Sequence, residues 1–339
     1  WEDPMLKTRN LIAPLAFAAS LGFTPLAAQE VTLRMATAAP PNTIWQQQFD
    51  QFAADVSEET EGRVSIEIFY NAQLGAEQAV MPQVMRGRID MGAFSVASLS
   101  DQVAEAYLTS LPFFYDDLDV RSCILDTVAD DFNDMIAPTG MRFLTWSEVG
   151  SGQMAGTKPF TTPDSLRDLR VGVAANPVAN LFWESQGSYP VNTPVTEAAS
   201  NISTGLIDAY NTIPVFYLFA GIAQVAPVLT KLDYVMAPAI ILINDRVWQK
   251  LSDEDRAGFE RALAKRPAAE RSAAFFAFEN QIYEMAKGKG GQIVVPTEEE
   301  RAQWSANIDD YYAKVLDDST DTGRAFFDKM VAARESCSK

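Results

Sequence analysis

The chain has 339 residues, 47% of them hydrophobic, and it carries 27 basic against 45 acidic side chains for a net charge of −18. This length and apolar fraction can fill the cores of two domains, whereas the negative charge argues against nucleic acid or an anionic membrane surface as a partner. The sequence has no histidine, which excludes an imidazole base, a Ser-His-Asp or Cys-His nucleophile and a histidine-bound metal.

The N-terminal segment has the three parts of a secretory signal peptide. Lys7 and Arg9 precede a mostly apolar run at 11–26, and small residues follow it. Two prolines and a glycine interrupt this run, so it is a poor membrane span. We therefore expect residues 1–28, which include four residues before the start methionine, to be removed by cleavage near Ala28 and the mature protein to be exported.

The segment 29–152 predicts a first α/β lobe. Short or alternating apolar runs indicate strands, and longer amphipathic stretches indicate helices. In chain order these are strand 31–36, helix 44–59, strand 64–70, helix 76–86, strand 91–95, a helix that follows Tyr115 and runs to about 136, and strand 141–147. Pro82 predicts a kink or a late start in the second helix.

The segment 153–236 predicts a second lobe of the same kind. Its expected elements are strand 169–173, helix 177–185, strand 189–191, a helix capped by Thr196 and ending at 204, strand 209–212 and strand 228–235. Strands that alternate with helices in this way are typical of α/β domains.

Beyond the second lobe the chain becomes mostly helical. Residues 237–275 are expected to return to the first lobe through strand 239–244 and to begin a helix at 253–287, long enough to lie across both lobes. Residues 276–339 are expected to form a C-terminal helical layer, with a short strand at 292–295 and a capping box that starts at Thr297.

A four-residue pattern occurs twice where a predicted helix passes into a strand. Gly87-Arg88-Ile89-Asp90 precedes strand 91–95, and Gly205-Leu206-Ile207-Asp208 precedes strand 209–212. Glycine is the residue best able to adopt the left-handed conformation that ends a helix. Open α/β sheets bind ligands at the carboxyl ends of their strands, so the pattern predicts a ligand cleft between two lobes.

Six further stretches carry a family signal. They are Gln73-Leu74-Gly75 with Glu77, Leu111–Tyr115, Gly140–Trp146, Thr162–Val171, Glu197 with Gly205 and Asp208, and Trp248 with Leu251 and Ser252. In this order they resemble the solute-binding proteins of tripartite ATP-independent periplasmic (TRAP) transporters of the DctP type. The resemblance implies a two-lobed periplasmic binding protein fold, type II-like, with a ligand cleft between the lobes and a long helix that spans both.

The same resemblance implies a function. Such a protein captures a small organic solute in the periplasm and delivers it to a small and a large membrane permease subunit, as a monomer and without a cofactor or metal. Two alternatives remain open: a binding protein of this fold that serves a sensor or chemoreceptor, and an exported hydrolase that uses a pair of carboxylates.

The arginines that hold a ligand carboxylate in this family are missing from the chain. Gly172 stands at the position of the first, and the stretch Ser151–Met154 contains no arginine for the second. Arg170, two residues earlier on the same face of the strand, either replaces the missing arginine or lies on the surface. Without a bidentate arginine, the cleft suits a neutral or positively charged solute better than a simple carboxylate.

Aromatic, amide, hydroxyl and carboxylate side chains at the expected element ends are the candidate ligand contacts. Together with Gly172, which stands at the position of the family's arginine, the set is Asn42, Trp45, Glu77, Ser95, Trp146, Glu148, Gln153, Asn176, Asn211, Thr212, Phe216 and Tyr217. Aromatic faces attract cations, and a buried carboxylate needs a partner. Each residue also has a structural alternative, such as core packing for the tryptophans or a helix-dipole contact for Glu77.

Both cysteines, Cys123 and Cys337, belong to the expected mature chain. In an oxidising compartment they can form a disulfide that ties the C-terminal tail to the helix after Asp119. Spacing alone does not fix connectivity, so two free thiols are the alternative.

Overall fold

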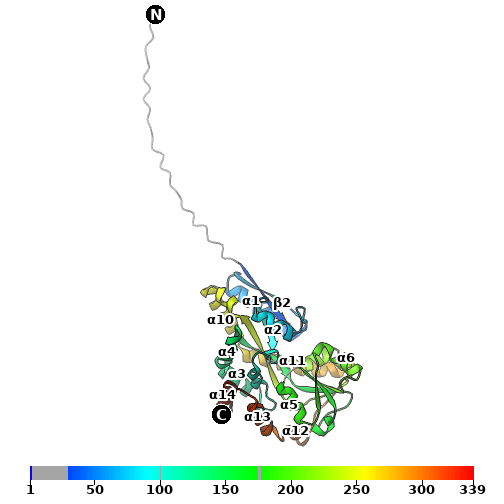
Figure 1. Ribbon diagram of the computed structural model, residues 1–339. Helices are drawn as coiled ribbons and strands as arrows, with labels where there is room; N and C mark the ends of the chain where they lie inside the picture. Colours follow the sequence, from blue (N-terminus) through cyan, green and yellow to red (C-terminus); the bar gives the residue numbers. More distant parts are fainter. Residues whose placement is uncertain (2–29, 100, 175–176) are drawn as a thin grey trace.

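The computed structural model describes residues 1, 30–99, 101–174 and 177–339. The expected signal peptide, from residue 2 onward, and Asn176 lie outside these residues. The described chain forms two α/β lobes, each built on one sheet (Figure 1), so the prediction of a two-lobed α/β fold is confirmed. Within the described ranges, no helix is both long and apolar enough to cross a membrane.

The first lobe is built on a five-stranded sheet with the order β2-β1-β3-β10-β4. Its strands are β1 (Val31–Thr37), β2 (Val64–Phe69), β3 (Met91–Ser95), β4 (Met141–Ser151) and β10 (Met236–Asn244). β1 pairs in parallel with β2 and β3, whereas β10 runs antiparallel between β3 and β4. A strand from late in the sequence therefore completes the sheet of the first lobe.

The second lobe is built on a six-stranded sheet with the order β11-β9-β5-β8-β6-β7. Its strands are β5 (Gln153–Gly156), β6 (Arg170–Val173), β7 (Tyr189–Asn192), β8 (Ala209–Thr212), β9 (Val228–Thr230) and β11 (Gln292–Val294). β6 lies in parallel between β7 and β8, as β1 lies between β2 and β3. Each lobe thus contains its own parallel three-stranded unit, and the two units have the same arrangement.

The two glycine-to-aspartate patterns occupy matching places in these units. Their glycines have left-handed backbones, with φ of +70° and +69°, as predicted. The carboxylate of Asp90 accepts the backbone N–H of Arg34 at 2.8 Å, and that of Asp208 accepts the backbone N–H of Arg170 at 2.9 Å. Each aspartate also donates its own N–H to the carbonyl of the same arginine. The pattern therefore fixes β3 and β8 beside their central strands.

Helices cover both sheets. Their bounds are α1 (Ile44–Glu59), α2 (Glu77–Met85), α3 (Leu118–Thr127), α4 (Ala129–Ile136), α5 (Pro177–Ser185), α6 (Ala198–Ser203), α7 (Pro214–Phe219), α8 (Ile222–Val225), α9 (Asp245–Lys250), α10 (Asp253–Lys265), α11 (Ala268–Gly288), α12 (Glu298–Trp304), α13 (Ile308–Asp317) and α14 (Asp321–Cys337). The predicted bounds of α1 and α5 and the capping box at Thr297 are confirmed.

The predicted long helix at 253–287 is two helices, α10 and α11, separated at Arg266 and Pro267. Proline has no N–H to donate and its ring clashes with the preceding turn, so Pro267 precedes a new helix instead of continuing the first. α11 reaches both lobes without α10, since Phe275 packs in the core of the first lobe and Tyr283 in the core of the second.

Three smaller predictions are wrong. The apolar run 228–235 is not one strand, because β9 ends at Thr230 and the chain then crosses to the first sheet. The helix expected to run to 136 is divided into α3 and α4. Thr196 lies in the 3₁₀ turn Val195–Glu197, and its side chain does not cap α6.

The C-terminal helices contact both lobes. Tyr312 of α13 donates its hydroxyl to the carbonyl of Pro112 in the first lobe. Its neighbour Tyr311 donates to the carbonyl of Val178 in the second lobe, at 3.0 Å. The layer therefore bridges the two lobes on the side away from α10 (Figure 1).

The two cysteines are joined in a disulfide. Cys123 lies in α3 and Cys337 ends α14, and their Cα atoms are 5.9 Å apart. The two helices also pack against one another, and Figure 1 shows the C-terminus beside them. The bond therefore ties the end of the C-terminal layer to the first lobe.

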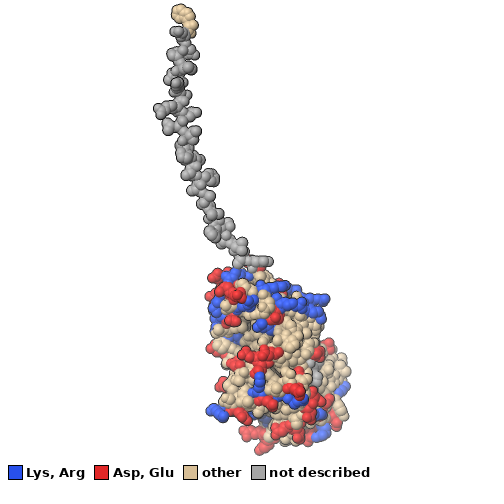
Figure 2. Space-filling model, turned by 60° about the vertical axis from the view of Figure 1, so that its left-hand side comes forward, with Lys and Arg blue, Asp and Glu red and all other residues tan. Residues whose placement is uncertain are grey.

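Acidic side chains are spread over the surface. Figure 2 shows Asp and Glu over the whole face in view, with Lys and Arg among them. Several surface cations pair with acidic neighbours, for example Arg261 with Glu59. The net charge of −18 thus belongs mainly to solvated faces.

Candidate ligand-binding cleft

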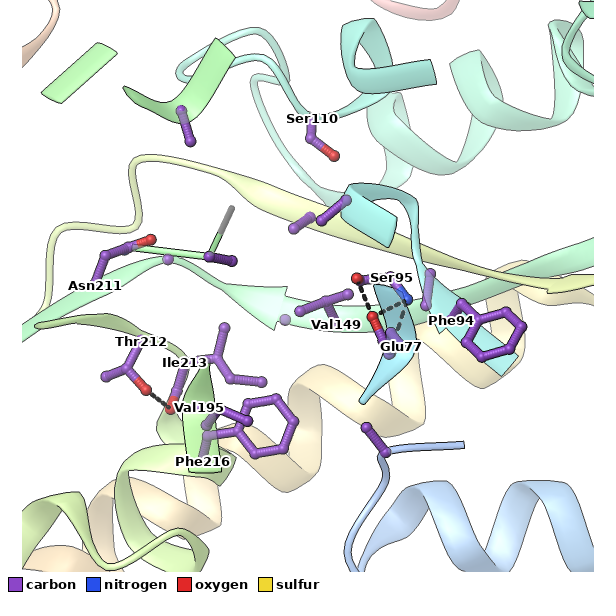
Figure 3. A pocket seen from close by; sticks show the side chains of 18 of the residues that line it. Glu77, Phe94, Ser95, Ser110, Val149, Val195, Asn211, Thr212, Ile213 and Phe216 are labelled. Carbon is purple, nitrogen blue, oxygen red and sulfur yellow. Dashed lines mark hydrogen bonds between the residues drawn. The ribbon is translucent and has the colours of Figure 1, made fainter. Parts of the chain in front are cut away.

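A cleft of about 660 Å³ lies between the two lobes, within the range of roughly 300–1,000 Å³ that is usual for small-molecule sites. Residues at the carboxyl ends of β1, β3, β7 and β8 line it. Figure 3 shows Glu77 and Ser95 of the first lobe on one side and Asn211, Thr212 and Phe216 of the second on the other. This is the place that the repeated glycine-to-aspartate pattern predicts.

The predicted contact residues divide into three groups. Seven line the cleft, namely Trp45, Glu77, Ser95, Glu148, Asn211, Thr212 and Phe216. Five lie outside its lining, namely Asn42, Trp146, Gln153, Gly172 and Tyr217. Asn176 lies outside the described residues. Prominent lining residues that the sequence did not reveal are Phe49, Phe94, Val195, Tyr210, Ile213, Tyr234 and Tyr311.

Two of the aromatic candidates are core residues. The indole N–H of Trp146 donates to the carbonyl of Leu125 at 2.9 Å, and the ring packs against Phe132 with centroids 4.7 Å apart. Tyr217 is fully buried in the core of the second lobe. Both therefore follow the structural alternative of core packing.

The polar candidates outside the lining are also used elsewhere. The Gln153 amide donates to Asp233 at 2.6 Å and to the Tyr283 hydroxyl at 2.9 Å, so it connects the second sheet to α11. Asn42 is exposed in the turn before α1, where its backbone has a positive φ of 62°. Neither side chain is positioned as a wall of the cleft.

Gly172 cannot gain a side chain without displacing its neighbours. A Cβ at this position would lie 2.5 Å from Cδ1 of Ile207 and 2.7 Å from Cδ2 of Tyr210. Tyr210 itself lines the cleft, so its ring takes space that a longer side chain at 172 would need. Arg170 does not replace the missing arginine, because its guanidinium pairs with Asp208 at 2.8 and 2.9 Å on the surface.

Glu148 is paired with a cation that the sequence did not reveal. Arg121 of α3 donates to both carboxylate oxygens, at 3.0 and 2.8 Å, and to the carbonyl of Met236 at 3.0 Å. The hydroxyl of Ser272 also donates to this carboxylate, and both members of the pair are almost fully buried. The expectation of cleft carboxylates without a cation is therefore wrong for Glu148, because Arg121 neutralises its charge.

Trp45 contacts both Glu148 and the second lobe. Its indole N–H donates to the backbone carbonyl of Glu148 at 2.7 Å. Its ring packs against Phe216 of α7 and Phe275 of α11, with centroids 5.4 and 5.2 Å away. Aromatic side chains from both lobes therefore meet in the lining of the cleft, where Trp45 contacts Phe216.

Glu77 differs from Glu148 because it has no cationic partner among the described residues. It is the first residue of α2, and its two carboxylate oxygens accept the backbone N–H of Ser95, each at 3.2 Å. The Ser95 hydroxyl donates to the same carboxylate. Burial raises the pKa of Glu77 to about 7, although both bonds from Ser95 act to lower it.

The described lining of the cleft contains no lysine or arginine. It is mostly apolar and aromatic, with scattered hydroxyl and amide groups. Nor do the described residues include a group of three or more cysteine or acidic side chains that could hold a metal ion. A bound solute would therefore meet one free carboxylate, several hydroxyls and aromatic walls.

Comparison with known proteins identifies the family. Residues 35–318 match the family described as bacterial extracellular solute-binding protein, family 7 (DctP). A solute-binding protein of Chromohalobacter salexigens is 28% identical over 226 residues, which cover 66% of this chain and 67% of that protein. The C4-dicarboxylate-binding periplasmic protein DctP of Rhodobacter capsulatus is 21% identical over 302 residues, 88% of this chain and 91% of that protein.

Solved structures show the same fold. A TRAP periplasmic solute-binding protein of Chromohalobacter salexigens with bound D-glucuronate has a TM-score of 0.82 at 23% identity, covering 89% of this chain and 99% of that one. One of Desulfovibrio desulfuricans with bound sn-glycerol-3-phosphate also has a TM-score of 0.82, at 21% identity, covering 90% and 97%. Because the family match spans most of its length, this chain belongs to the bacterial extracellular solute-binding proteins of family 7.

Proposed function

We propose that this protein is the exported solute-binding subunit of a TRAP transporter. It captures a small organic solute between its lobes and delivers it to the membrane permease subunits. Membership of the family supports this proposal, as does a cleft whose walls come from both lobes. Movement of the lobes about the segments that connect them can then enclose the solute and replace its water shell with fixed side chains.

The observation that carries the ligand preference is the absence of a cation from the described cleft lining. The structural relatives were solved with D-glucuronate and sn-glycerol-3-phosphate, both of which are anions. Binding such an anion to this cleft would leave its charge without a cationic partner, next to the carboxylate of Glu77, at a considerable desolvation cost. We therefore expect the solute not to be a simple acid.

A thermal-shift screen tests this function. The purified mature protein is heated with succinate, malate, D-glucuronate, uncharged polyols and sugars, and amines. A ligand at 100 times its Kd adds about 2.7 kcal/mol to the free energy of unfolding, so a true solute raises Tm by several degrees.

We expect no shift with the acids and a clear shift with at least one uncharged or cationic compound. A rise in Tm with succinate, malate or D-glucuronate would show that the cleft holds carboxylates without an arginine. If no class of compound shifted Tm, solute binding itself would be in question.

A further inference from the structure

We propose that the solute is an organic cation, whose ammonium group binds the Glu77 carboxylate while its apolar body lies along the aromatic walls. This inference rests on the proposed function, because it names the chemical class that the same cleft takes. It goes beyond the lack of an arginine, since a neutral solute would satisfy that observation equally well.

Glu77 is positioned to meet a solute in the cleft. It lies where α2 begins and where β3 ends, and its side chain meets Ser95 at the cleft (Figure 3). Ser95 donates its N–H and its hydroxyl to the carboxylate, which holds the group in one orientation. A carboxylate offers about four acceptor sites, so capacity remains for a donor from the solute.

Glu148 and Glu77 are the two glutamates among the described residues that line the cleft, and the protein treats their carboxylates differently. Glu148 receives both arms of Arg121 and the hydroxyl of Ser272, so the protein itself neutralises it. Among the described residues, Glu77 receives neutral donors, namely the N–H and the hydroxyl of Ser95. A desolvated carboxylate is costly unless it is paired with a cation. When Glu77 is ionised, its charge is therefore the one that no cation of the described residues neutralises.

The side chains that line the cleft are largely aromatic. Trp45 and Phe216 form a tilted pair, and Phe49, Phe94 and Tyr210 also line the cleft. Aromatic faces attract cations through their negative quadrupole and cover apolar surface equally well. Together with the missing lysine and arginine, these walls favour an ammonium compound with a hydrocarbon body over a polyhydroxylated sugar.

The test uses compounds of matched shape and different charge. The first set is 2-phenylethylamine, 2-phenylethanol and phenylacetate. The second set is cyclohexylmethylamine, cyclohexylmethanol and cyclohexylacetate. Their affinities are measured by titration calorimetry at pH 8 with the mature protein. We expect the amine of each set to bind most tightly and the carboxylate not to bind.

The variant Glu77→Gln keeps the shape of the side chain and removes its charge. We expect it to weaken amine binding at least tenfold and alcohol binding much less, because only the amine loses an ion pair. Glu77→Asp should retain part of the amine affinity. The matched control is Glu67→Gln, since Glu67 is exposed on β2 and outside the cleft. The melting temperature of each free variant establishes that it is folded.

The pH dependence provides a second readout. With the pKa of Glu77 near 7, the carboxylate is mostly protonated at pH 6 and mostly charged at pH 8, so amine affinity in the wild type should rise about tenfold between these values. Alkylamines stay protonated throughout this range. The other titratable groups of the described lining are Glu148, which is paired with Arg121, and Tyr107, Tyr210, Tyr234 and Tyr311. Tyrosines titrate near pH 10 or above, so the rise should disappear in Glu77→Gln.

Several outcomes overturn the proposal. These are tighter binding of either carboxylate than of its amine, equal amine affinity in the wild type and Glu77→Gln, and no amine binding at all. If the amines fail while a polyol or sugar from the thermal-shift screen binds, the ligand class is wrong and the solute-binding function stands.

Discussion

Gly172 and Tyr210 depend on one another, because the tyrosine ring lies in the space beside the glycine. The tyrosine ring and Ile207 occupy the space beside the glycine, where a Cβ would come within 2.7 Å of both. The space that an arginine at 172 would need is thus filled, and the buried ring is held by a hydrogen bond from its hydroxyl to the carbonyl of Thr193 at 3.3 Å. Restoring an arginine alone would therefore not restore a carboxylate site.

The variant Gly172→Arg tests this coupling. We expect it to lower the free energy of unfolding by about 1–3 kcal/mol, because it overpacks the second lobe, and to gain no affinity for D-glucuronate. The double variant with Tyr210→Ala should have room for the guanidinium and should show a rise in Tm with D-glucuronate. Gly288→Arg is the control, since a Cβ at Gly288 meets nothing within 4 Å. A stable single variant that binds D-glucuronate would contradict the coupling.

For single residues, the sequence predicted those whose conformation depends on their neighbours in the chain. The glycines of the repeated pattern have the expected left-handed conformation because a helix end is determined by neighbouring residues. The partner of Glu148 was not predictable, since Arg121 lies 27 residues away in α3 and looks like an ordinary helix-surface arginine. A charge pair that depends on tertiary packing leaves no local signal.

Among the elements, α11 carries a buried glutamate whose carboxylate is bonded to a serine, as that of Glu77 is. Glu279 is 2% exposed and accepts the N–H and the hydroxyl of Ser151. Ser151 ends β4, directly before the chain crosses to the second lobe at Gly152. Burial raises the pKa of Glu279 to about 8, and the charges of Asp233 and Glu148 add to this shift against the bonds from Ser151.

This shift predicts a pH-dependent stability. Because the pKa of Glu279 is about 4.5 in the unfolded chain and about 8 in the folded one, the folded state binds the proton more tightly. Its contribution is complete below pH 4.5 and is lost as pH rises to 8, by up to roughly 5 kcal/mol. Glu279→Gln should therefore gain stability relative to the wild type as pH rises from 5 to 8, measured by urea unfolding. The exposed Glu270→Gln in the same helix is the control, and parallel profiles for wild type and Glu279→Gln would contradict the prediction.

Elements with a continuous amphipathic or apolar pattern were predictable. Segments that pass from one sheet to the other were not. α1 has its predicted bounds because Trp45, Phe49, Phe52 and Val56 fall on one buried face. The apolar run after Val228 looks like a single strand, but only its first three residues pair in the second sheet. The remainder crosses between lobes, where burial requires apolar residues without requiring a strand.

At the scale of the whole molecule, the C-terminal layer stabilises the pair of lobes. Tyr311 and Tyr312 bond to backbone carbonyls of different lobes, and Tyr311 also lines the cleft. The disulfide between Cys123 and Cys337 holds the end of this layer on α3. From the sequence, helices were predictable here, but their position across both lobes was not, because no local pattern encodes which surface a terminal helix covers.

The disulfide should therefore matter for stability and little for recognition. It closes a loop with a sequence separation of 214 residues, for which chain entropy predicts a stabilisation of roughly 5 kcal/mol before any native strain is subtracted. We expect Cys123→Ser and Cys337→Ser, alone or together, to lower Tm by the same amount, because each breaks the same bond. Ligand affinity well below Tm should stay within about twofold, since neither cysteine lines the cleft. Unequal losses in the two single variants would mean that one thiol has a packing role of its own, and an unchanged Tm would mean that the helix contacts of α14 alone hold the layer in place.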